Sequence, residues 1–208
     1  MMATLVHTRP RWDALVRLTH WGIAIGVIAN RLLIEGGSGL HIWIGYAVGA
    51  LLALRLLWGL VGSASARFAS FLPDPSAAIA HIRDIKAGRM RVYPSHNPLG
   101  ALMVYALWAM LIIVVATGIA MASAHSVISP NAQAAEAAYA LPTPAAAEEE
   151  NESRGEHEEE SMLGETHELA ANLLLALAVL HVAGVALEVR RGDRGLVRAM
   201  ISGRADHD

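Results

Sequence analysis

The sequence predicts an all-α integral membrane protein: a bundle of four spanning helices with both termini in the cytoplasm. The first observation behind this prediction is that 54% of the 208 residues are hydrophobic. They are concentrated in four stretches, each near the ~20 residues that cross ~30 Å of hydrocarbon. The second observation is the uneven placement of Lys and Arg. Together they predict one membrane domain over 1–208, with spans at about 15–34, 39–60, 99–121 and 167–189.

The basic residues set the orientation of this bundle. Of sixteen Lys and Arg, three lie in the N-terminal segment, five in the second connection and five in the tail. Cytoplasmic segments carry an excess of Lys and Arg. We therefore expect both termini and the second connection to be cytoplasmic, and the first and third connections to face outward.

The connections differ in character. A short Gly-rich turn, "EGGSGL", joins the first two spans and makes them antiparallel neighbours. The second connection is longer and contains Ile79, Ile82 and Ile85 at helical spacing among basic residues, which predicts a short amphipathic helix on the inner surface. The outer connection, about 122–166, is rich in Ala, Pro and Glu. We interpret it as a solvated, mobile segment, with a docking surface for a basic soluble partner as the alternative.

Four histidines lie in two pairs at two matched depths of the spans. His20 and His181 lie about one and a half turns inside the first and fourth spans from the cytoplasmic side, and His41 and His167 open their spans on the outer side. Bis-imidazole ligation of two haem irons requires this arrangement, because each iron needs two opposed nitrogens from facing helices. The predicted pairs are His20 with His181 and His41 with His167. For each histidine taken singly, an interfacial or hydrogen-bonded role stays open.

No cysteine is present, which excludes disulfides, thiolate-held iron–sulfur clusters and thioether attachment of haem. Any haem in this protein is therefore held without covalent bonds to its macrocycle.

Two arginines accompany the histidine pairs. Arg31 follows His20 by eleven residues and faces the same way, and Arg55 stands in a similar relation to His41, fourteen residues on. Each arginine would reach the depth of the haem that its own helix does not ligate, where a planar cation pairs with propionates. The alternative is that both side chains extend to the lipid headgroups.

Other residues receive weaker assignments. Contact with the edge of the inner haem or with a quinone headgroup stays open for His96, and His125 is the fallback outer ligand should His41 be misplaced. We assign His81 no haem. Glycines four apart in the first two spans are interpreted as ordinary contacts between membrane helices: Gly22, Gly26, Gly45 and Gly49.

Several segments together resemble a known family. In chain order they are "WDALVRLTHW", "HIWIGYAVGALLALRLLWGLVG", "HNPLGALMVYALW", "THELAANLLLALAVLHVAGVALE" and "LVRAMISGR". This series is similar to the bacterial cytochrome b561 family, which is itself similar to the b-type cytochrome subunits of nickel–iron hydrogenases. The resemblance implies a four-helix bundle with two b-type haems between the helices, and by position its ligand histidines fall on His20, His41, His167 and His181. The long Ala/Glu-rich outer connection departs from the usual pattern.

The expected function is that of a di-haem cytochrome of a bacterial inner membrane, part of a respiratory chain. It would pass electrons between a periplasmic redox partner, such as a cytochrome c, and quinone or another acceptor. Whether it is itself a quinone-reactive oxidoreductase stays open, as does a homodimer, and no nucleic-acid partner is expected. The alternatives are the anchor subunit of a hydrogenase-like complex and, from another class, a divalent-metal transporter or sensor.

Overall fold

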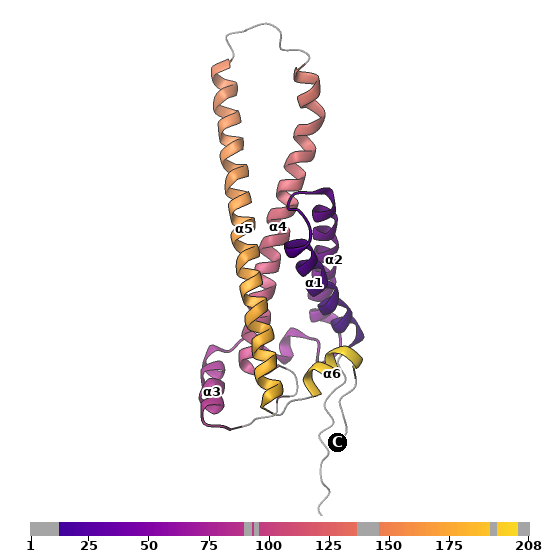
Figure 1. Cartoon of the computed structure of the whole chain (residues 1–208), viewed down its shortest axis with the longest axis vertical. Coiled ribbons are helices and arrows are strands. Elements are labelled where there is room, and N and C mark those ends of the chain that lie inside the picture. Colours follow the sequence, from indigo (N-terminus) through magenta and orange to yellow (C-terminus); the bar gives the residue numbers. More distant parts are fainter. Residues whose placement is uncertain (1–12, 90–92, 94–95, 137–145, 192–194, 204–208) are drawn as a thin grey trace, which may run out of the picture.

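The computed structural model describes residues 13–89, 93, 96–136, 146–191 and 195–203, with the backbone alone described for 124–136, 146–161 and 195–196. Figure 1 shows long helices standing side by side, with short helices gathered at one end. The elements are α1 (Ala14–Leu32), α2 (Gly39–Val61), the 3₁₀ turn η1 (Phe68–Ser70), α3 (Pro75–Lys86), α4 (Pro98–Glu136), α5 (Ala146–Arg190) and α6 (Gly195–Ser202). The described part of the chain contains helices and no strand, which confirms the all-α class.

Three of the described helices are long and apolar enough to cross a membrane. They are α2, the Pro98–Ser123 part of α4 and the Met162–Arg190 part of α5, in agreement with three of the predicted spans. The fourth predicted span, 15–34, corresponds to α1, which is 19 residues long and carries Arg17, His20, Asn30 and Arg31. These polar side chains lower its hydropathy, so crossing of the membrane by α1 stays a prediction.

The turn between α1 and α2 is fixed by local hydrogen bonds. Gly37 adopts φ +75°, a left-handed conformation that glycine reaches without steric cost. Ser38 then caps α2, its side chain accepting from the backbone N–H of His41 at 3.2 Å. The amide of Asn30 donates to the carbonyl of His41 at 3.0 Å. The first turn of α2, which carries His41, is therefore tied to α1.

The second connection contains the predicted short helix. Asp74 caps α3 by accepting from the backbone N–H groups of Ser76 and Ala77. Ile79 and Ile82 are exposed, whereas His81 and Asp84 are buried against the rest of the chain. The helix is two-faced as expected, but its inward face combines Ala78 with the polar His81 and Asp84, while Arg83 and Lys86 are exposed.

The outer connection is helical over its described residues, 122–136 and 146–166, and its interpretation as a solvated, mobile segment stays a prediction. Residues 122–136 continue α4 and residues 146–166 belong to α5, so both helices extend beyond the turn that joins α1 and α2 (Figure 1). Ala and Glu are among the best helix formers, which explains why this composition extends the helices rather than interrupting them.

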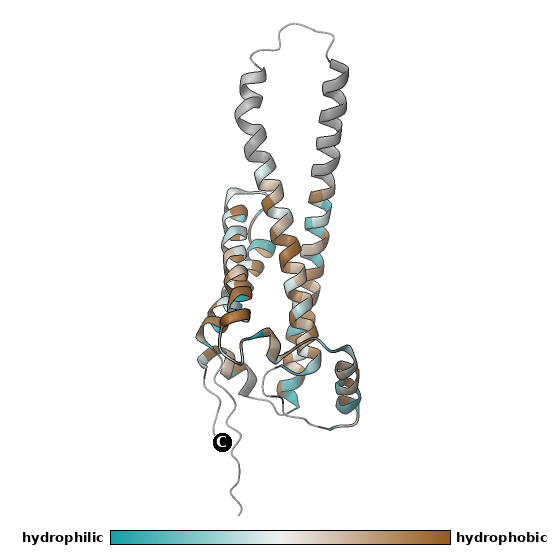
Figure 2. Ribbon diagram, turned by 180° about the vertical axis from the view of Figure 1, so that it is seen from behind, coloured by the Kyte–Doolittle hydropathy of each residue, from teal (hydrophilic) through white to brown (hydrophobic). Residues whose placement is uncertain are grey.

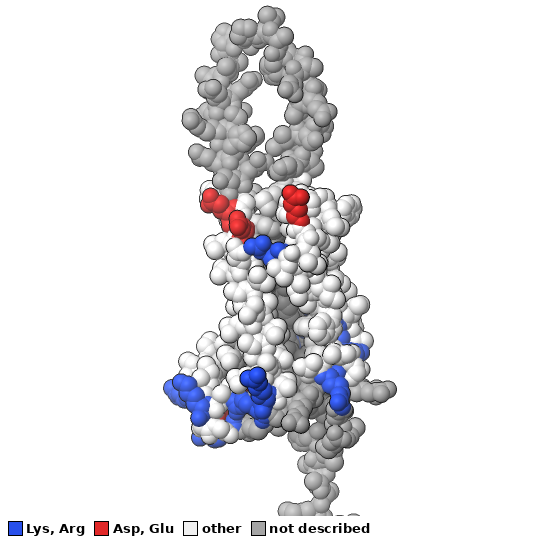
Figure 3. All heavy atoms as spheres, in the orientation of Figure 1, with Lys and Arg blue, Asp and Glu red and all other residues white. Residues whose placement is uncertain are grey.

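An apolar layer crosses the middle of the bundle. Val48 and Leu52 of α2, Leu111 of α4 and Leu174 of α5 pack together as its buried core. In Figure 2 the middle stretches of the long helices are mostly brown to white, and teal gathers toward their ends and on α3. On the face shown in Figure 3, most of the blue Lys and Arg side chains gather at the end with the short helices, and the red acidic ones lie near the opposite end.

Candidate functional site

Two pairs of imidazoles face each other at two levels of the bundle. His20 of α1 and His181 of α5 have ring centroids 6.4 Å apart, with the ring planes inclined by 56°. His41 of α2 and His167 of α5 have centroids 6.1 Å apart and an inclination of 65°. The structure thus brings the four histidines together in the pairs that the sequence predicts, and their ligation of iron remains a proposal.

The ring separations fit a metal ion held between the rings. A metal–imidazole bond is about 2.0 Å and a ring nitrogen lies about 1.1 Å from its ring centre, so two imidazoles on opposite sides of one ion have centroids about 6 Å apart. The Nδ1 atoms of His20 and His41 are in addition buried without a hydrogen-bond partner. No protein group competes for this nitrogen, so both rings remain available as iron ligands. The donor set therefore fits two bis-imidazole haems.

The packing of the helices also fits a haem between α5 and the α1–α2 pair. Among the described elements, close packing joins α1 with α2, α2 with α4, α3 with α4, α4 with α5 and α5 with α6. By contrast, α5 does not pack closely along α1 or α2, although its two imidazoles face theirs. This spacing is what a planar macrocycle between α5 and the α1–α2 pair requires.

The glycines divide into two groups. A Cβ atom at Gly22, Gly26 or Gly49 would touch Leu51, Val48 or Val115, respectively, so these three lie at helix contacts as expected. Gly45 does not: a Cβ atom there would meet nothing within 4 Å. Because Gly45 lies one helical turn after His41 on the same face, the open space adjoins the outer histidine pair.

The outer pair receives a further contact from α4. The Nδ1 atom of His167 lies 3.0 Å from the hydroxyl oxygen of Thr117. A Cβ atom at Gly118 would lie 3.2 Å from Cε1 of the same ring. The sequence analysis missed Thr117, since one threonine in an apolar span gives no signal of its partner.

The two arginines occupy different environments. Arg31 is exposed and donates to the side-chain oxygen of Asn172 at 2.6 Å, and Asn172 lies five residues after His167 on α5. Arg55 is buried, with 6% of its surface exposed, and donates to the carbonyl of Ala66 at 3.3 Å. Its guanidinium carbon lies 5.1 Å from the centre of the Trp108 ring. Arg55 therefore points into the protein rather than to the headgroups, and its Nη1 is buried without a partner.

His96 lies near the inner pair. Its ring centroid is 4.6 Å from that of Phe71. Burial lowers the pKa of His96 to about 4, with further lowering by the nearby Arg55, His181 and His20. His96 is therefore neutral at physiological pH, and Arg55 lies close enough to it to lower its pKa further. The fallback ligand His125 lies in a part of α4 whose side chains are not described.

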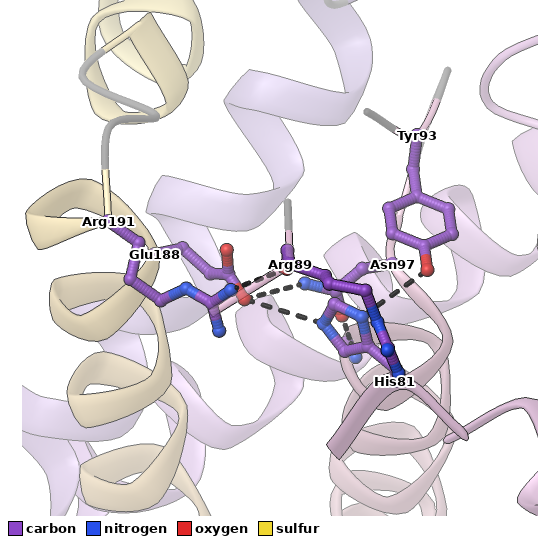
Figure 4. A network of polar contacts seen from close by, with 7 residues as sticks. His81, Arg89, Tyr93, Asn97, Glu188 and Arg191 are labelled. Atoms are coloured by element: carbon purple, nitrogen blue, oxygen red, sulfur yellow. Dashed lines mark hydrogen bonds and ion pairs between the residues drawn. The ribbon is translucent and has the colours of Figure 1, made fainter. Parts of the chain in front are cut away.

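A polar network, shown in Figure 4, closes the end of the bundle with the short helices. The buried His81 of α3 lies 3.5 Å from the carboxylate of Glu188 near the end of α5, and its Nδ1 lies 3.3 Å from the hydroxyl of Tyr93. Asn97 donates to the same carboxylate at 3.3 Å. The network links α3 to the start of α4 and the end of α5, which gives His81 a structural role that the sequence analysis did not assign.

The C-terminal helix is attached close to the inner pair. Arg17 donates to the carbonyl of Ile201 at 2.9 Å, and the indole of Trp21 donates to the carbonyl of Met200 at 3.1 Å. Trp21 also meets the edge of the His20 ring, with centroids 5.2 Å apart. The last carbonyls of α6 are thus satisfied by α1 next to the inner histidine.

Within the part of the chain that the structure describes, no group of three or more His, Cys, Asp or Glu residues is arranged to hold a metal ion by itself. Paired imidazoles are the ligands that haem iron uses. The outer connection, on which the divalent-metal alternative rests, lies mostly outside the described side chains.

The described part of the chain combines helices, three of them apolar and long enough to cross a membrane, with two facing imidazole pairs, and these are features of a membrane-bound b-type cytochrome. The sequence matches the family of prokaryotic cytochrome b561 over residues 11–203, and the chain belongs to that family. It is therefore a membrane cytochrome of the b type that takes part in electron transfer, and b-type haem is its implied cofactor. No curated protein and no solved structure matches the chain.

Proposed function

We propose that this protein binds two b-type haems and carries electrons across a bacterial inner membrane. The electrons would pass between a periplasmic redox partner, such as a cytochrome c, and quinone or another acceptor. The observation that carries the proposal is the presence of two facing imidazole pairs at separate levels of one bundle. The two ring centroids are 6.4 Å apart in the inner pair and 6.1 Å apart in the outer pair.

In this proposal, His41 and His167 hold the outer haem and His20 and His181 hold the inner one. When bound, each haem supplies a one-electron iron centre. The fourteen residues from His167 to His181 rise about 21 Å along α5, so both sides of the membrane have a haem within reach. The apolar layer around Leu174, halfway between these two histidines, excludes water between the two sites.

Arg31 and Arg55 would pair with haem propionates. In support, Arg31 donates to Asn172, five residues after His167 on α5, and Arg55 has one buried nitrogen without a partner. A guanidinium next to a propionate reduces the cost of burying that carboxylate.

Haem content tests the proposal. A pyridine haemochrome assay on the purified protein should give two b-type haems per chain, and reduced-minus-oxidised spectra should resolve them. His20→Ala or His181→Ala should remove one haem, and His41→Ala or His167→Ala the other. His96→Ala is the matched control, because this imidazole lies near the inner pair but is not a proposed ligand.

Two results would contradict the proposal. A chain without haem, from cells with ample haem precursor, would exclude the di-haem function. Loss of the same haem by changes at both levels would overturn the pairing. The hydrogenase-anchor alternative uses the same haem sites and differs in the partner, which co-purification with a hydrogenase subunit would reveal.

A further inference from the structure

We propose that Thr117 of α4 is a positioning residue for His167, which fixes the imidazole tautomer and thereby lowers the reduction potential of the outer haem. This inference rests on the haem sites proposed above. It gives a role to the α4 span, whose segment Pro98–Ser123 contains no histidine.

The hydrogen bonds of the Thr117 hydroxyl determine which partner donates. Its oxygen lies 2.7 Å from the carbonyl oxygen of Ile113 and 3.1 Å from that of Val114. It also lies 3.0 Å from Nδ1 of His167. A hydroxyl has one proton and a carbonyl can only accept. Because threonine in a helix commonly donates to the carbonyl four residues earlier, the proton goes to the α4 backbone and Nδ1–H of His167 donates to the hydroxyl oxygen.

The Nδ1 edge of the His167 ring faces α4. The ring lies directly against the backbone of α4, where a Cβ atom at Gly118 would be 3.2 Å from Cε1. A proton on Nδ1 leaves the lone pair on Nε2, the nitrogen then available to iron.

The hydrogen bond from His167 to Thr117 has an electronic consequence for the iron. An imidazole that donates its second N–H to an acceptor is a stronger ligand, and a stronger donor favours the ferric state of the iron. The outer haem should therefore have a lower potential than it would have without Thr117. In the inner pair, His20 has no such hydrogen bond, because its Nδ1 is buried without a partner. The effect of Thr117 should accordingly be confined to the outer haem.

The test compares three variants of the full chain. Thr117→Val keeps the branched shape and removes the hydroxyl, and Thr117→Ser restores it. Thr166→Val is the matched control, because the exposed hydroxyl of Thr166 donates to the carbonyl of Met162 in its own helix, next to His167 in sequence. The measurements are redox titration of both haems, the electron paramagnetic resonance spectrum of the ferric protein, and the haem affinity of each site. The outer-haem signals are those that disappear in His41→Ala.

In Thr117→Val, we expect a shift of the outer haem to a more positive potential, a changed outer-haem resonance and about tenfold weaker outer-haem binding. The inner haem should not change. Thr117→Ser should restore all three properties, and Thr166→Val should leave them as in the unmodified chain. An unchanged outer haem in Thr117→Val, or an equal shift of both haems, would overturn the inference while leaving the di-haem proposal intact.

A measurement on haem-free protein separates this inference from the proposed function. Nitrogen magnetic resonance of ¹⁵N-histidine-labelled chain, with His167 assigned by substitution, should show the Nδ1–H tautomer in the unmodified protein and a mixture in Thr117→Val. The other tautomer in the unmodified chain would overturn the positioning role, whatever the haem content. A chain that never binds haem would overturn the proposed function and the effect on potential.

Discussion

The side chain of Arg55 carries a cation inside the bundle. It is 94% shielded, since 6% of its surface is exposed, and it contacts the carbonyl of Ala66 and the face of Trp108. Burying a charge is costly unless it is paired, and one of its nitrogens has no partner. An anionic group near the inner histidine pair would supply that partner, and a haem propionate has the required charge.

Removing this cation should lower the potential of the inner haem. A nearby positive charge disfavours the ferric state, so Arg55→Gln should stabilise ferric iron. Charges about 10 Å apart at an effective dielectric of ~20 interact by roughly 1–2 kcal/mol. Because ~1.4 kcal/mol corresponds to about 59 mV for one electron, we expect a fall of roughly 40–90 mV in redox titration. Arg67→Gln, an exposed cation in the following connection, is the control, and an equal fall in both variants would contradict the assignment.

The open space at Gly45 gives a second prediction at this scale. A larger side chain meets no protein atom there, so Gly45→Leu should be accepted by the polypeptide alone. It would occupy the space beside His41 where the outer macrocycle is proposed to lie. We expect loss of the outer haem, with the inner haem retained, in reduced-minus-oxidised spectra. Ala47→Leu, an exposed position on another face of α2, should keep both haems; two haems in Gly45→Leu would contradict the proposed location.

At the scale of elements, the end of α2 is held by aromatic packing. The ring of Phe68 in η1 lies over Gly59 and is flanked by Trp108, with centroids 5.1 Å apart, and by Tyr105 at 6.3 Å. This cluster lies next to the Ala66 carbonyl that Arg55 contacts. The packing of η1 on α2 and α4 thus fixes the loop that faces the inner site.

A methyl group at Gly59 should disturb this packing. The Cβ atom of Gly59→Ala would collide with the Phe68 ring, which its aromatic neighbours hold in place. Overpacking typically costs about 1–3 kcal/mol, so thermal unfolding in detergent should begin at a lower temperature. Gly39→Ala in the same helix, where the added atom meets nothing within 4 Å, is the control. Equal stability of the two variants would show that η1 moves freely.

At the scale of the whole molecule, charge is distributed unevenly along the long axis, with the basic side chains gathered at one end. The end with the short helices carries most of the basic side chains on the face shown in Figure 3, and the arms of α4 and α5 extend from the other end (Figure 1). By the positive-inside bias, the basic end is expected to be cytoplasmic. The outer histidine pair would then lie on the periplasmic side, beneath the helical arms.

Reporter fusions test this orientation. Green fluorescent protein fused after Asp208 should fluoresce, and alkaline phosphatase fused there should be inactive, because its disulfides form outside the cytoplasm. Alkaline phosphatase inserted at residue 140, in the connection between the arms, should be active. A fusion that ends at Gly37, after α1 alone, should also be active if α1 crosses the membrane. Phosphatase activity at the C-terminus would reverse the predicted topology.

The sequence by itself determined the features that depend on local periodicity and composition. It predicted three apolar spans that the structure contains, the cap-bounded helix in the second connection and the placement of His167 and His181 on one side of α5, because a helix fixes these relations along a single chain segment. The family followed from the same segments.

The tertiary structure alone decided the features that depend on which surfaces meet. The approach of Thr117 to His167, the inward turn of Arg55, the burial of His81 against Glu188 and the open space at Gly45 involve different helices or the space between them. Helix periodicity sets the direction of a side chain around the axis of its helix, but it does not determine which helix lies opposite that side chain. The helical arms in the outer connection were not predicted for a related reason: Ala- and Glu-rich composition suits both a solvated segment and a helix, and here helices α4 and α5 extend into it.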